Sequence, residues 1–236
     1  MKKWMLEKVR PFFGNWGRKH LPGLYKIYEK MFWTIVIKRR NKGLHQKGYL
    51  YLDKIDAVMK KYEIDYFLTY GTLLGIIREG EFIPYDDDID LGVIENERFS
   101  WEKLEKAMSE IGMEKKIQFR LNEKLTEQTY REGNLSVDFF LYEEKEGKSV
   151  SYVYYQEEGK AYEKDDFSVS QNVTSLIDKT KKIESKGRIF SVPEQPELFL
   201  EEIYGPDWRV PIAGWSKERD VVEGGKGRRE KSSDNN

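Results

Sequence analysis

Four aspartates occupy five positions in a stretch that otherwise has the pattern of a folded core. Residues 71–93 read GTLLGIIREGEFIPYDDDIDLGV, and the four acids are Asp86, Asp87, Asp88 and Asp90. They adjoin an apolar alternation formed by Ile89, Leu91 and Val93. Carboxylates this close together repel and raise one another's pKa unless a cation lies between them. The stretch therefore predicts either a bound metal ion or a water-filled surface.

Side-chain alternation favours the metal ion. Residues 88–94 have the period of a strand, in which side chains repeat every two residues, so Asp88 and Asp90 share one face. A further isolated acid, Asp138, lies in a second predicted strand, SVDFFLY, at residues 136–142. Burying acids on neighbouring strands without a cation is costly. A solvated acidic turn is therefore the weaker interpretation.

A calcium loop is another alternative, because four acids have the spacing of an EF-hand: Asp86, Asp88, Asp90 and Glu97. Position six of such a loop requires Gly for its sharp turn, and this chain has Leu91 there. Pro84 also interrupts the helix that should lead into the loop. We therefore favour a catalytic metal site on the two strands.

Composition indicates which ion such a site would hold. The chain has no Cys, and its two His, His20 and His45, lie outside the acidic stretch. Oxygen ligands are typical of Mg²⁺, Mn²⁺ or Ca²⁺ rather than zinc. The lack of Cys also excludes disulfides and cysteine nucleophiles and fits a reducing compartment. We expect Asp88, Asp90 and Asp138 to ligate one or two Mg²⁺ (or Mn²⁺) ions against phosphate oxygens, a set suited to phosphoryl transfer.

The segment before the acids predicts a phosphate contact. Residues 71–79 have the pattern of a helix that follows a buried strand, so Gly71 and Thr72 lie at a helix N-terminus. Backbone N–H groups at such a terminus can receive a phosphate. Arg78 can add a fork of donors. An ion pair between Arg78 and Glu79 or Glu81 is an equal alternative.

Chain length and patterning predict one substantial core with additions. The 236 residues suffice for a single domain, and helix and strand patterns over residues 48–215 predict the α+β class. Residues 216–236 contain few apolar groups and are predicted to be a disordered tail. No apolar run approaches the roughly 20 residues that span a bilayer, and no secretory signal pattern is found.

Residues 1–47 form a basic, aromatic arm. They carry thirteen Lys and Arg against two Glu, a net charge of +11, which leaves about −12 for the remainder. Aromatic residues are interleaved with these cations, among them Trp4, Phe12, Phe13, Trp16, Tyr25, Phe32 and Trp33. This composition favours an arm that lies on an anionic membrane surface. Helices packed on the domain are an alternative, and a nucleic-acid arm is the least favoured interpretation.

Three segments together resemble a known family. YFLTYGTLLGIIREGEFIPYDDDIDLGV, then VDFF, then VPEQPELFLEEIYGPDW are similar to the LicD family of phosphotransferases, which includes fukutin and its related protein. The similarity covers about residues 48–211, and its motifs arrive in order. It implies a nucleotidyltransferase-like fold, with a small mixed sheet flanked by helices. Residues 1–47 lie outside it as a basic aromatic extension.

The resemblance also implies roles for individual residues. It implies metal ligation by Asp88, Asp90 and Asp138, with Gly71, Thr72 and Arg78 near the phosphates of a donor. Asp86 and Asp87 match the motif and would orient the ligands or contact the acceptor. The family often has Trp at the position of Tyr85, so we expect a packing role for this aromatic ring. In the YGPDW motif, a helix cap and a buried Trp208 would close the core.

The activity that the resemblance implies is a transfer reaction. A phosphorylated alcohol, such as phosphocholine, phosphoribitol or phosphoglycerol, would move from a CDP-linked donor to a sugar hydroxyl of a cell-surface or lipid-linked glycan, with release of CMP. Asp138 or Asp87 would serve as the base. We expect a cytoplasmic enzyme, peripheral on the inner face of the membrane. Alternatives are a nucleotidyltransferase that releases pyrophosphate and a non-catalytic binding protein on the same fold.

Overall fold

The computed structural model describes residues 20, 22–157, 162, 163, 165–212 and 220–232. Its helices are α2 (Pro22–Lys61), α3 (Tyr70–Arg78), α4 (Trp101–Glu110) and α5 (Pro196–Tyr204). Its strands are β1 (Tyr66–Leu68), β2 (Ile89–Ile94), β3 (Glu114–Leu121), β4 (Lys124–Glu132), β5 (Leu135–Lys145), β6 (Lys148–Tyr155), β7 (Asp166–Ser175), β8 (Thr180–Ser185), β9 (Arg188–Pro193), β10 (Asp220–Val221) and β11 (Gly227–Lys231).

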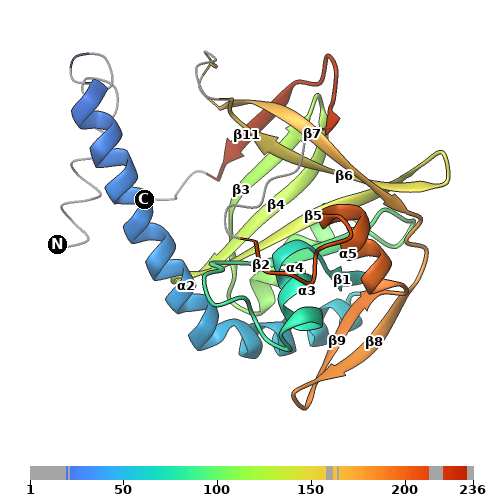
Figure 1. Ribbon diagram of the computed structural model, residues 1–236. Helices are drawn as coiled ribbons and strands as arrows, with labels where there is room; N and C mark the ends of the chain where they lie inside the picture. The colour runs from blue at the N-terminus through green and yellow to red at the C-terminus, as the bar shows by residue number, and fades with distance from the viewer. Residues whose placement is uncertain (1–19, 21, 158–161, 164, 213–219, 233–236) are drawn as a thin grey trace.

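A mixed sheet organises the described residues. Its order is β1-β2-β5-β4-β3-β11-β7-β10, and β6 pairs with both β5 and β7, while β8 and β9 form a separate hairpin. Only β2 and β5 are parallel among the described strand pairs. Six strands close into a ring through successive pairing: β5, β4, β3, β11, β7 and β6. Helix α3 packs on β2, α4 on α2 and β3, and α5 on α3 and β7 (Figure 1). The expected α+β class is confirmed.

Strand β5 separates the core from the acidic side of the sheet. Its alternate residues are fully or almost fully buried: Val137, Phe139 and Leu141. Helix α2 packs on this strand and on α4, and it contributes Leu44, Ile55 and Met59 to the same core. Because neighbouring side chains of a strand point to opposite faces, Asp138 is directed away from this core.

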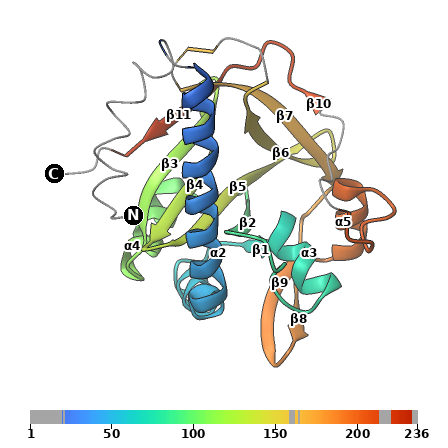
Figure 2. The same ribbon diagram turned by 60° about the vertical axis from the view of Figure 1, so that its left-hand side comes forward.

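Helix α2 crosses the boundary that the sequence predicts at residue 47. It is one continuous helix of 40 residues, so the described part of the arm, from Pro22 onward, is an extension of a core helix. The N-terminal half stands clear of the sheet while the C-terminal half lies beneath it (Figures 1 and 2). Residues 1–19 of the arm lie outside the described residues. Among the residues that are described, no helix is both long enough and apolar enough to cross a membrane.

The prediction of a disordered tail is wrong for part of residues 216–236. Strand β11 fills the gap between β3 and β7 and pairs with both. Gly227 permits this close approach, because a Cβ there would lie 2.7 Å from a Tyr154 ring carbon. Arg229 forms an ion pair with Asp165 at 2.6 Å. Backbone pairing and ion pairs therefore order a segment with few apolar groups; residues 216–219 and 233–236 lie outside the described residues.

Candidate active site

The structure brings the three predicted metal ligands together. Asp90 on β2 is the register partner of Asp138 on β5 in the parallel pair, and Asp88 immediately precedes β2. One carboxylate oxygen from each of the three lies within 4.8 Å of the others. Asp86, Asp87 and Asp88 form a second group that meets the same criterion, so Asp88 belongs to both. The EF-hand spacing is coincidental, because residues 89–94 form strand β2 in place of a calcium loop.

Burial and mutual repulsion act on these carboxylates together. Burial, followed by the charges of neighbouring acids, raises the pKa of Asp88 and of Asp90 well above the ordinary value. Burial also raises the pKa of Asp138, and it raises the pKa of Asp86 to about 6. A bound cation would favour the ionised form of these carboxylates.

The residues present fit a hard divalent cation. Asp138 Oδ1 and Asp86 Oδ2 are buried and accept no hydrogen bond from any described residue. All donors at the cluster are carboxylate oxygens, the ligands that Mg²⁺ and Mn²⁺ prefer. A buried acceptor without a partner is costly, and a bound ion would satisfy it.

Helix α3 holds Asp90 in place through two hydrogen bonds. The Gly71 N–H donates to Asp90 Oδ2 at 3.2 Å, and the Asp90 N–H donates to Thr72 Oγ1 at 2.9 Å. A Cβ at Gly71 would lie 2.7 Å from Asp86 Oδ2, so a larger residue there would have to displace this carboxylate. The predicted neighbours of the donor phosphates thus directly contact the acids. Their N-terminal position on α3 agrees with the sequence-based expectation.

Arg78 forms the ion pair that was its alternative role. Its Nη2 lies 2.6 Å from Glu79 Oε1, and its Nη1 donates to the Trp208 backbone oxygen at 3.4 Å. Its side chain is only 9% exposed. Arg78 nevertheless lines a cavity of about 650 Å³ that Gly71 and Asp86 also line. Arg78 therefore forms the ion pair with Glu79 and also lines the cavity beside Asp86.

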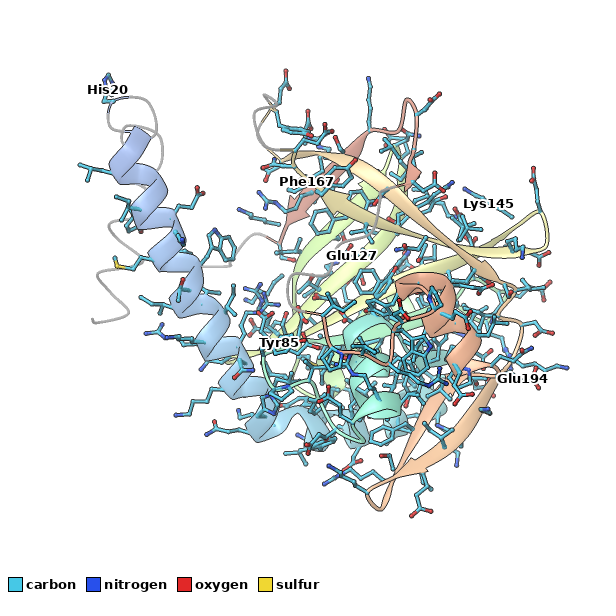
Figure 3. All side chains as sticks on the ribbon, viewed as in Figure 1. His20, Tyr85, Glu127, Lys145, Phe167 and Glu194 are labelled. Atoms are coloured by element: carbon cyan, nitrogen blue, oxygen red, sulfur yellow. The ribbon has the colours of Figure 1, made fainter. Side chains whose placement is uncertain are left out.

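The same cavity is lined by the YGPDW motif and by Tyr85. Its far wall consists of Tyr204, Asp207, Trp208, Val210, Pro211 and Ile212. Trp208 is 4% exposed, as expected for a residue that closes the core, yet its Nε1 has no hydrogen-bond partner among the described residues. The packing role expected for Tyr85 is wrong, because this side chain is 70% exposed and stands at the cavity on the side of the body facing α2 (Figure 3).

Sequence reasoning missed a basic contact from helix α2. The Arg40 Nη2 lies 3.0 Å from Asp88 Oδ2, and its Nε lies 3.2 Å from Asp87 Oδ2. Asn41 donates to the backbone oxygens of Pro84 and Asp86 at 2.9 and 2.6 Å. Both residues lie within the arm predicted over residues 1–47, and no local motif distinguishes Arg40 from the other cations there.

Strand β4 contributes a second missed group. Thr129 is the register partner of Asp138, and Glu127 and Arg131 lie two residues to either side on the same face. Burial, followed by the charges of Asp138 and Asp88, raises the pKa of Glu127 well above its ordinary value. Figure 3 shows Glu127 among the strands. Seven of the nine residues 124–132 are polar, so no apolar alternation marks this strand in the sequence.

Comparisons with known proteins agree with this arrangement. The family described as "LicD/FKTN/FKRP, nucleotidyltransferase domain" matches residues 63–195. The lipopolysaccharide cholinephosphotransferase LicD of Haemophilus influenzae is 29% identical over 106 residues, 39% of this chain and 40% of that protein. An uncharacterized protein of Rickettsia typhi is 31% identical over 55 residues, 23% of this chain and 18% of that protein. The chain thus spans less than half the length of either curated relative.

The family match includes every clustered aspartate and excludes Arg40. Residues 63–195 contain both groups of three acids together with strand β4, whereas helix α2 precedes the match entirely. The match covers more than half of the 236 residues. The chain therefore belongs to the LicD family.

Proposed function

We propose that the chain transfers a phosphorylated alcohol from a CDP-linked donor to a sugar hydroxyl of a cell-surface or lipid-linked glycan and releases CMP. The alcohol would be of the choline, ribitol or glycerol type. The observation that carries the proposal is the cluster of Asp88, Asp90 and Asp138 inside the family domain. The relative from Haemophilus influenzae, named a lipopolysaccharide cholinephosphotransferase, supports both the reaction class and a glycan acceptor.

The cavity beside the acids is the proposed donor site. Gly71 and Asp86 line it at the acid cluster, and Tyr85 and Trp208 provide aromatic surface further along. Pockets for small molecules typically combine apolar walls with a few polar groups. In this arrangement the diphosphate would lie at the acids and the remainder of the donor against the aromatic wall. We also propose that the acids on β2 and β5 have the catalytic arrangement of a nucleotidyltransferase.

The proposed reaction is an in-line displacement at phosphorus. The acceptor oxygen bonds to the phosphorus that carries the alcohol, and the bond from this phosphorus to the bridging oxygen breaks. CMP leaves with that electron pair. Mg²⁺ (or Mn²⁺), held by Asp88, Asp90 and Asp138, would supply charge neutralisation of the diphosphate when bound. Gly71 and Thr72 would keep Asp90 oriented for this task through their hydrogen bonds.

A carboxylate oxygen must accept the proton of the acceptor hydroxyl. Asp138 and Asp87 remain the two candidates, each in one of the two acid groups. Asp138 Oδ1 and Asp87 Oδ2 are both buried without a hydrogen-bond partner among the described residues. The proposal therefore keeps both carboxylates as candidates for the proton acceptor.

We further propose that the arm holds the enzyme on the cytoplasmic face of an anionic membrane. Five large apolar side chains of α2 are exposed: Leu24, Ile27, Met31, Trp33 and Ile37. Exposed cations alternate with them at Lys30, Lys38 and Arg39. Apolar insertion combined with attraction to anionic lipid is typical of interfacial helices. A lipid-linked acceptor would then lie near the site.

A mass-spectrometric screen tests the proposed reaction. The full chain with Mg²⁺ is incubated with CDP-choline, CDP-ribitol, CDP-glycerol or a nucleoside triphosphate, each against a panel of glycan acceptors. We expect CMP release and the mass of a phosphoalcohol on the acceptor. Pyrophosphate release with a nucleotide on the product would instead establish the nucleotidyltransferase alternative. No reaction across the panel would favour a non-catalytic binding protein.

A further inference from the structure

One guanidinium from outside the family domain reaches the acid cluster. Arg40 lies on helix α2, 23 residues before the family match begins, and contacts Asp87 and Asp88 at 3.2 and 3.0 Å. Its side chain is 17% exposed, so the contact is largely shielded from solvent. Asp88 belongs to both groups of acids. A cation at this position therefore acts on the whole cluster.

The position of Arg40 is set by close contacts on the same turn of helix. Asn41 ties α2 to the backbone of the acidic segment at two carbonyl oxygens. Gly43 lets the helix touch the turn between β4 and β5, because a Cβ there would lie 2.6 Å from the Asn134 backbone oxygen. Leu44 is fully buried in the core. These contacts hold helix α2 in place and thereby fix the position of Arg40 beside the acids.

A second guanidinium lies on the same side of the sheet as the acid cluster. Arg131 on β4 lies on the face of Asp138, and its Nε has no hydrogen-bond partner among the described residues. Arg40 reaches this acid cluster from helix α2, so guanidiniums from two different elements face the acids. Two Arg forks at one site are typical of phosphate recognition.

We propose that Arg40 is a substrate-positioning residue of this site, whose guanidinium fixes Asp87 and Asp88 and binds a phosphate oxygen of the diphosphate donor. The proposal rests on the proposed function for the identity of the donor, and on the contacts of Arg40 for its position. It assigns helix α2 a direct part in the site, in addition to its part in the core.

The proposal predicts that removal of the Arg40 guanidinium changes metal affinity and diphosphate affinity in opposite directions. The Arg40 guanidinium repels a divalent cation bound at the acids, so its removal strengthens metal binding. The same guanidinium attracts phosphate, so its removal weakens diphosphate binding. A residue with a merely structural role would weaken both when substituted. Metal affinity measured without any donor therefore separates the two explanations.

The experiment uses the full chain with Arg40→Gln, with Arg40→Lys, and with Arg39→Gln as the matched control. Arg39 is the adjacent, exposed arginine, so its loss removes the same charge without touching the acids. Titration calorimetry measures binding of Mn²⁺ alone, and then of inorganic pyrophosphate at saturating Mg²⁺. Pyrophosphate is chosen because its binding does not depend on which nucleotide or alcohol the enzyme uses.

We expect Arg40→Gln to bind Mn²⁺ about three- to tenfold more tightly and magnesium pyrophosphate about tenfold more weakly. Arg39→Gln should leave both affinities within about twofold, since exposed charges act weakly. Arg40→Lys keeps the charge and loses the fork, so Mn²⁺ affinity should hold while pyrophosphate affinity falls. Weaker or unchanged Mn²⁺ binding by Arg40→Gln, or undiminished pyrophosphate binding, would overturn the proposal.

These measurements distinguish an error in the proposed function from an error in the role of Arg40. If the unchanged chain binds Mn²⁺ and pyrophosphate as expected but transfers nothing from CDP-alcohols, the reaction is wrong and the role of Arg40 stands. If the unchanged chain binds no Mn²⁺, both the metal site and the role of Arg40 are wrong.

Discussion

Asp90 and Asp138 are register partners in the parallel pair of β2 and β5, although 47 residues separate them in the chain. Parallel strands that are direct neighbours place equivalent residues side by side on one face. Each of two carboxylates on that face disfavours the ionised form of the other unless a cation compensates their charge. The pairing of these two strands is therefore what converts scattered acids into a candidate metal site.

The first prediction concerns the carboxylates themselves. Asp88→Asn and Asp90→Asn should each reduce Mg²⁺-dependent turnover by at least about 100-fold, because each removes an oxygen ligand and a negative charge from the ion. Circular dichroism should show an unchanged fold. Asp178→Asn, which alters an exposed acid before β8, serves as the control and should retain full activity. Near-normal turnover in either cluster variant would contradict the assignment.

The second prediction concerns stability without metal. Asp138→Asn should raise the free energy of unfolding in EDTA by about 1–3 kcal/mol, because it removes one buried charge from a group of like charges. Thermal denaturation measures this difference. Saturating Mn²⁺ should then stabilise the unchanged chain by about 2.7 kcal/mol at 100 times the Kd, and Asp138→Asn by much less. Equal stabilisation of both proteins by Mn²⁺ would place the ion elsewhere.

The pH dependence of the metal-free chain follows from the same groups. Burial raises the pKa of Asp86 to about 6 and also raises those of Asp88 and Asp90. Between the unfolded value of about 4 and the folded value, the folded chain binds more protons than the unfolded chain. The free energy of unfolding in EDTA should therefore fall as the pH rises through this window. Saturating Mn²⁺ should make the free energy of unfolding less dependent on pH above about pH 6. Urea denaturation at several pH values, in EDTA and in Mn²⁺, measures both trends.

Local patterns predicted the elements that carry the acids. The strand and helix patterns over residues 66–94 correspond to β1, α3 and β2, and SVDFFLY lies within β5. The final helix ends where expected, at Gly205, whose φ is 88°. These segments have strong apolar periodicity, which reports burial directly.

The other strands and the contact of Arg40 depend on long-range packing, which no local sequence pattern encodes. Strands β4 and β7 are rich in polar residues and went unrecognised, because the ring of strands buries their Thr, Ser and Gln side chains. The cap of α4 is Ser100, whose Oγ accepts from the Lys103 N–H, while Asn96 Oδ1 accepts from the N–H groups of Arg98 and Phe99 in the preceding turn. Arg40 meets its partners across 48 positions. Only the packing of α2 reveals that contact.

The fourth prediction concerns the arm. The full chain should float with liposomes that contain anionic lipid, and Ile27→Glu should reduce the bound fraction severalfold, because a charge replaces an inserted apolar side chain. Ile189→Glu on β9 is a matched control, since Ile27 and Ile189 are each 66% exposed. Equal loss of binding in both variants, or no binding of the unchanged chain, would show that the exposed apolar residues of α2 have another role.

The central claim is that Asp88, Asp90 and Asp138 hold a divalent ion. Crystals of the unchanged full chain soaked in Mn²⁺ test it most directly, because anomalous scattering identifies the ion and its position together. We predict an anomalous peak among these three carboxylates, with oxygen ligands at about 2.0–2.3 Å. An empty cluster at saturating Mn²⁺, or an ion bound only by Asp86 and Asp87, would contradict the account.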